Sequence, residues 1–134
     1  MNSNIPLTLL GGLSPSQFMR RHWQKKPLLV RQAVPGFQSP LQWADLKRLA
    51  GQADVESRLI VQDGSDWRLR QGPLSASSFP ARRRRQWTFL VQGVNLHDDR
   101  INDFMRQFRF VPDARLDDLM ISWASDGGGV GPHF

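Results

Sequence analysis

The sequence predicts an α+β fold, because helical periodicity near the N-terminus gives way to strand periodicity after Val55. Two segments carry the same helix-start signature, a Ser followed by Pro and then by Gln, at Ser14–Gln17 and Ser39–Gln42. Further along, the turn dipeptide Asp63-Gly64 separates two strand-like runs, as in a β-hairpin. We therefore expect N-terminal helices packed on a mainly antiparallel sheet.

The two signatures predict two capped helices. In the first, residues 14–23, Phe18 and His22 share one face because they lie four positions apart. The second runs from Ser39 through Leu49, and Gly51 should close it.

Apolar, β-branched and aromatic runs predict five strands. They are Leu28–Val30, Val55–Gln62, Trp67–Gln71, Gln86–Val94 and Leu116–Ala124.

A third helix should follow the fourth strand. Either Asn95 or His97 can cap it, and Asp98 and Asp99 favour its N-terminus electrostatically. One apolar stripe at helical spacing indicates its core-facing side: Ile101, Phe104, Met105 and Phe108. The helix should end at residues 111–113.

Charge is the strongest compositional signal. The 134 residues carry a formal charge of +6, with an uninterrupted run of Arg82, Arg83, Arg84 and Arg85. Such a run is either a solvated loop or a set of contacts to phosphates, which would make association depend on salt. An acidic partner such as nucleic acid or a ribonucleoprotein fits the second interpretation.

The sequence has no cysteine, which excludes disulfides and thiolate metal sites. The N-terminus lacks the positive region of a signal peptide, and no apolar stretch reaches the length of a membrane span. We expect no membrane association and a cytoplasmic location.

A glycine-rich segment at the C-terminus leads to the strongest candidate for a metal ligand, His133. The loop residues that would position this histidine are Gly127, Gly128, Gly129, Gly131 and Pro132. Glycine lets backbone approach a ligand closely, and histidine is a common metal ligand. The alternative interpretation is a surface turn with an exposed histidine.

Four segments in order resemble the bacterial ribosomal oxygenases, which are cupin-fold, JmjC-type dioxygenases. They are Arg21–Leu28, Glu56–Leu59, Asp117–Ser122 and Gly127–His133. The resemblance implies Fe(II) and 2-oxoglutarate as cofactor and co-substrate, and an arginine of a large-subunit ribosomal protein as substrate. It also implies that residues 1–134 are the N-terminal part of a single JmjC/cupin-like domain, a truncated double-stranded β-helix.

In this resemblance His133 is the first iron ligand, and the sequence ends inside the His-x-Asp metal motif. The carboxylate and the second histidine of a facial triad would follow it, so the fragment alone should be inactive. The full-length protein should form a homodimer. Asp126 can bind a guanidinium substrate or, alternatively, cap a turn.

We expect the remaining candidates to be structural: Asp117 and Asp118 on the surface, and His22 and His97 without a second ligand. Two other functions stay open. One is a non-catalytic cupin-like module that binds ribosomal RNA or protein through its basic face. The other is a scaffolding fragment that works through its capped helices.

Overall fold

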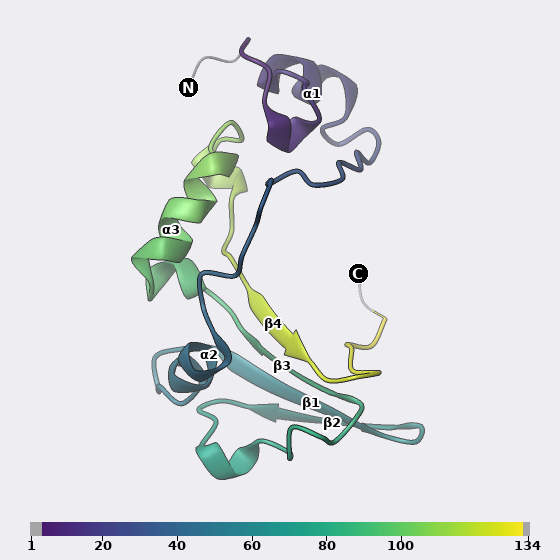
Figure 1. Ribbon diagram of the computed structural model, residues 1–134, viewed down its shortest axis with the longest axis vertical. Helices are drawn as coiled ribbons and strands as arrows, with labels where there is room; N and C mark the ends of the chain where they lie inside the picture. Colours follow the sequence, from purple (N-terminus) through teal and green to yellow (C-terminus); the bar gives the residue numbers. More distant parts are fainter. Residues whose placement is uncertain (1–3, 133–134) are drawn as a thin grey trace. The chain divides into compact units, whose positions relative to one another are not determined.

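The computed structural model describes residues 4–132. Its backbone contacts divide the chain into two compact units (Figure 1). The first comprises Met1–Ser39 and Gln107–Leu116, and the second comprises Pro40–Arg106 and Asp117–Phe134. Whether both belong to one domain stays a prediction, and each unit is described separately.

The first unit contains helix α1, Pro15–Arg21, preceded by a 3₁₀ turn at Thr8–Leu10. The predicted capping box is confirmed: the backbone N–H of Gln17 donates to Ser14 Oγ (3.2 Å), and that of Ser14 donates to Gln17 Oε1 (2.9 Å). Phe18 and His22 stack with ring centroids 6.0 Å apart, as their shared face predicts. The helix ends two residues earlier than expected.

The predicted strand Leu28–Val30 is wrong. This segment has no regular structure, and Leu29 is 78% exposed. A strand needs a neighbouring strand to satisfy its backbone groups. All strands among the described residues lie in the second unit, so this apolar run has no strand partner in its own unit.

The second unit is built on an antiparallel sheet of four strands, which confirms the α+β prediction. The strands are β1 Ser57–Asp63, β2 Asp66–Gln71, β3 Trp87–Val91 and β4 Ile121–Ala124. They lie in the order β2-β1-β3-β4 (Figure 1). Strand β2 is therefore an edge strand, and all its residues are exposed.

The predicted hairpin is confirmed. Asp63 pairs with Asp66, so the loop consists of Gly64 and Ser65. Gly64 has a φ of 62°, a left-handed conformation that glycine adopts without steric cost. Of the turn dipeptide, Asp63 is therefore the last residue of β1, and Gly64 is the first residue of the loop.

Strand β1 begins at Ser57 instead of Val55, and two other strands are much shorter than predicted. Strand β3 is fully buried but stops at Val91. Strand β4 begins only at Ile121, because the residues before it bind the turn after β3 instead of extending the ladder. Asp118 accepts from the backbone N–H of Gly93, and the backbone N–H of Leu119 donates to Asn95 Oδ1.

Helix α2, Trp43–Ala50, covers one face of the sheet and begins later than predicted. Its N-cap is Gln42 rather than Ser39, in a capping box with Asp45. Gly51 follows the helix as expected, with an ordinary negative φ.

An aromatic cluster fixes α2 on the sheet. The Trp43 ring meets those of Phe89 and Trp123 at centroid distances of 5.1 and 4.7 Å. Phe89 pairs with Trp123 across β3 and β4, so both side chains lie on the same sheet face. These rings and the buried leucines of α2 form the core.

Helix α3, Asp99–Met105, is capped by Asp98, and the predicted caps Asn95 and His97 are wrong. Residues 94–96 form a 3₁₀ turn that occupies the expected first turn. Of the predicted stripe, only Ile101 is fully buried. The helix ends at Met105 and continues as a 3₁₀ turn, well before residues 111–113.

Candidate functional site

The glycine loop is anchored to the start of β3. The hydroxyl of Ser125 accepts from the backbone N–H of Trp87 (3.0 Å), and the backbone N–H of Ser125 donates to the Trp87 carbonyl (2.9 Å). The N–H of Gly128 then donates to the Ser125 carbonyl (2.8 Å), closing a four-residue turn. Gly127 occupies the third position with a φ of 68°.

Gly128 lies directly against the backbone of β3. A Cβ atom at this residue would stand 2.3 Å from the Trp87 carbonyl oxygen and 2.9 Å from that of Ser125. A Cβ at Gly129 or Gly131 would meet no atom within 4 Å. The loop therefore requires glycine at Gly127 for its conformation and at Gly128 for close approach.

The predicted metal ligand His133 lies outside the described residues. Residues 4–132 contain no group of three His, Cys, Asp or Glu side chains that could hold a metal ion. The described part of the chain thus does not by itself supply the ligands of an Fe(II) centre.

The other two histidines have structural surroundings. His22 stacks on Phe18, and its Nδ1 lies 3.3 Å from the Pro27 carbonyl oxygen. His97 follows a 3₁₀ turn and is half-buried.

Asp126 lies in the turn before the glycines, with a side chain that is 77% exposed. Its carboxylate contacts the guanidinium of Arg85 at 2.9 Å, and its backbone carbonyl accepts from the N–H of Gln86 (3.0 Å). The residue therefore belongs to a turn and already has a guanidinium neighbour from its own chain. Its role in binding substrate stays a prediction.

Asp117 is exposed, as expected of a surface residue. Asp118 is half-buried, and its carboxylate accepts from the backbone N–H of Gly93 in the turn after β3, so it has the expected structural role. The carboxylate of Asp118 thus accepts the hydrogen bond from Gly93 that the backbone of a neighbouring strand would otherwise accept.

The side chains of the arginine run are exposed, but three of the four contact other residues of the chain. Arg84 contacts Asp63 at 2.5 Å, Arg85 contacts Asp126, and the Arg82 guanidinium lies 5.5 Å from the centre of the Trp43 ring. Only Arg83 has neither an ion pair nor a ring contact among the described residues. The solvated-loop interpretation is therefore incomplete, because most of the run also binds its own chain.

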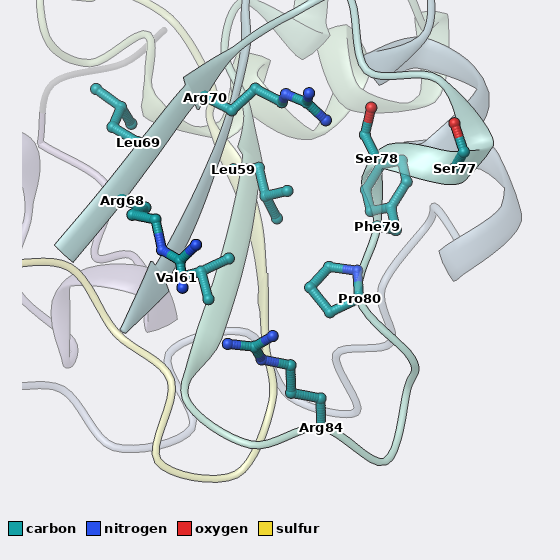
Figure 2. A pocket seen from close by; sticks show the side chains of 10 residues that line it. All are labelled: Leu59, Val61, Arg68, Leu69, Arg70, Ser77, Ser78, Phe79, Pro80 and Arg84. Atoms are coloured by element: carbon teal, nitrogen blue, oxygen red, sulfur yellow. The ribbon is translucent and has the colours of Figure 1, made fainter. Parts of the chain in front are cut away.

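Figure 2 shows a cavity beside β2 that the sequence analysis missed. It has a volume of about 500 Å³, and three arginines, Arg68, Arg70 and Arg84, line it. The alternation of Arg68 and Arg70 along one strand could have indicated that both face the same side. Their meeting with Arg84 depends on the loop that leads into β3.

No family model matches the chain. The chain is 40% identical over 116 residues to the ribosomal protein uL16 3-hydroxylase of Escherichia coli, covering 87% of this chain and 31% of the relative. It is 32% identical over 133 residues to a probable ribosomal oxygenase of Haemophilus influenzae, covering 98% of this chain and 33% of the relative.

The fold is similar to that of solved ribosomal oxygenase structures. The structure of YcfD, a ribosomal oxygenase from Escherichia coli, matches with a TM-score of 0.82 and 38% identity over 90% of this chain and 33% of the other. A complex of the same oxygenase with cobalt and 2-oxoglutarate matches with a TM-score of 0.81, over 88% of this chain and 32% of the other. The resemblance to ribosomal oxygenases is therefore confirmed, and the chain spans about a third of their length.

Proposed function

We propose that this chain is part of an Fe(II)- and 2-oxoglutarate-dependent protein hydroxylase. The observation that carries the proposal is its similarity, over 87% of its residues, to a ribosomal protein uL16 3-hydroxylase. A related oxygenase structure contains cobalt, which can stand in for Fe(II), and 2-oxoglutarate. The cofactor and co-substrate of the whole protein should therefore be Fe(II) and 2-oxoglutarate.

In this proposal His133 supplies one iron ligand, and the loop before it determines where that imidazole lies. The support is the anchoring of this loop: Ser125 binds Trp87 through two hydrogen bonds, and Gly128 packs on the Trp87 carbonyl. A fixed loop base restricts the path of the following residues. The remaining ligands would come from sequence beyond residue 134 of the whole protein.

The substrate is an arginine in a large-subunit ribosomal protein, as the resemblance to ribosomal oxygenases implies. Asp126 is a candidate for binding it, since a carboxylate forms charge-assisted hydrogen bonds to a guanidinium and already does so with Arg85. The substrate would have to displace Arg85 from this contact.

The whole protein should work in the cytoplasm as a homodimer. No helix among the described residues is long and apolar enough to cross a bilayer. The basic run Arg82–Arg85 supports an additional contact with ribosomal RNA.

Activity tests this proposal directly. The whole protein, with Fe(II), 2-oxoglutarate and a peptide of the ribosomal protein, should form succinate and add one oxygen atom to the peptide. We expect His133→Ala to abolish turnover and the 134-residue chain to be inactive, because one imidazole cannot hold Fe(II) against water. His22→Ala, a histidine substitution outside the loop, should keep turnover.

Turnover by the short chain would contradict the assignment of His133. A second candidate function is a non-catalytic module that binds ribosomal RNA or protein, and the basic surface favours it. Absence of turnover by the whole protein with every ribosomal peptide would leave this second function ahead.

A further inference from the structure

The cavity beside β2 combines a basic rim with an apolar floor. Its rim carries the guanidinium groups of Arg68, Arg70 and Arg84, which we call the arginine cluster. Leu59 and Val61 form the floor. The hydroxyl-bearing and ring residues of the opposite wall come from the segment after β2: Ser77, Ser78, Phe79 and Pro80.

Strand register places two of the three arginines. Arg68 pairs with Val61 and Arg70 with Leu59 across β1 and β2, so all four side chains lie on one face. Figure 2 shows both guanidinium groups on this side, with Leu69 pointing away. Arg84 reaches the same space from the loop that precedes β3.

The charge of the cluster is not balanced. Asp63 binds both Arg68 and Arg84, and its cross-strand partner Asp66 lies on the same face of β2 as Arg68 and Arg70. Arg70 has no carboxylate partner among the described residues. Two carboxylates cannot neutralise three guanidinium groups, and Arg82 and Arg83 add positive charge along the same loop.

The cavity offers little for reading a nucleotide base. The Phe79 ring already meets Trp43 and Phe89 edge to face, at centroid distances of 6.0 and 5.1 Å. The polar groups that line the cavity are the planar, cationic guanidinium groups of the cluster, each with several N–H donors, and the hydroxyls of Ser77 and Ser78, which also contact Ser75 Oγ at 3.0 Å. Phosphate oxygens match this set, because guanidinium binds phosphate through paired hydrogen bonds.

We propose that the arginine cluster binds phosphate groups of RNA without reading its sequence. The proposal rests on the RNA contact proposed above. It places that contact at Arg68 and Arg70 of β2 together with Arg84, the one member of the Arg82–Arg85 run that lines the cavity. We favour RNA over an acidic peptide because the proposed substrate is a ribosomal protein, whose surroundings supply RNA phosphates, and these repeat along the backbone as the arginines do from β2 into the loop 82–85.

The test measures binding of a labelled, mixed-sequence, single-stranded RNA to the whole protein at several salt concentrations, by fluorescence anisotropy. The double variant R70Q/R84Q removes two charges from the cluster. The matched control R20Q/R31Q removes two exposed charges from the other unit, where neither side chain has a partner among the described residues. Net charge is then equal in both variants.

Losing two phosphate contacts should make the negative slope of log K against log salt less steep by about 1.4. Over a fourfold rise in salt, the affinity of the unchanged protein should therefore fall about sevenfold more than that of R70Q/R84Q. R20Q/R31Q should keep the original slope. Unchanged far-UV circular dichroism in both variants shows that folding is not the cause.

Equal loss of slope in both double variants would overturn the proposal. It would show that RNA responds to the overall positive charge of the protein and not to the arginine cluster. Tighter binding of poly-glutamate than of RNA at equal charge, with only the poly-glutamate affinity reduced in R70Q/R84Q, would identify a site for acidic peptides and would also overturn the proposal. RNA binding is measured without iron or 2-oxoglutarate. Its failure therefore leaves the hydroxylase proposal untouched, and failure of turnover leaves this one untouched.

Discussion

Replacing Gly128 by alanine should damage the proposed site, although the change adds only one methyl group. The new Cβ would lie 2.3 Å from the Trp87 carbonyl oxygen, whereas carbon and carbonyl oxygen pack at about 3.3 Å. The loop would have to move by about 1 Å. Overpacking of this kind costs about 1–3 kcal/mol in stability.

The functional effect should exceed the effect on stability. A displacement of about 1 Å at a catalytic group can reduce turnover roughly 100-fold, and Gly128 lies five residues before His133. The assay is succinate formation by the whole protein with a ribosomal-protein peptide, together with urea unfolding.

Gly129→Ala is the matched control, because its Cβ would meet no atom within 4 Å and its φ is not left-handed. It should keep turnover and leave stability unchanged or raise it by up to about 1 kcal/mol. If Gly128→Ala were as active and as stable as Gly129→Ala, the anchoring of the loop on β3 would not position His133.

Three further predictions concern stability and are measured by urea or acid unfolding. Trp43→Ala should lower the free energy of unfolding by about 3–5 kcal/mol, because the Trp43 ring packs in the aromatic core. Trp67→Ala should lower it far less, because Trp67 is 47% exposed on the edge strand. Equal losses in the two variants would contradict the assignment of Trp43 to the core. Ser14→Ala should cost about 1 kcal/mol through loss of the capping box, and no change would show that the cap contributes nothing. The side-chain hydrogen bond from Arg100 holds the pKa of Asp98 below its usual value. The Asp98 carboxylate should therefore stabilise the fold fully above about pH 3.9, and this stabilisation should disappear as pH falls through the lower pKa of the folded state. Asp98→Asn should flatten the dependence of stability on acid pH, and an unchanged acid profile in this variant would refute the prediction.

The sequence alone determined the elements whose signals are local. The capping box of α1 involves Ser14 and Gln17, three residues apart, and the hairpin turn needs only Gly64 and its neighbours. Both depend on interactions within one turn of backbone, which the order of residues specifies directly. The C-terminal glycines and the resemblance to ribosomal oxygenases were likewise readable from residue types in order.

Tertiary structure decided what depends on distant partners. The helix-start signature places the cap of the second helix at Ser39, but α2 starts one turn later, after Gln42, where Trp43 packs into the aromatic core. The run Leu28–Val30 has strand composition but no neighbouring strand in its unit.

The same reason explains why the sequence missed the arginine cluster and the anchoring of the loop. Arg68 and Arg70 meet Arg84 only because β2 pairs with β1 and the loop returns beside them. Gly128 must be glycine because β3 and β4 pair and bring it onto Trp87. Such contacts form only when strand register closes long loops, which a local pattern of residues does not specify.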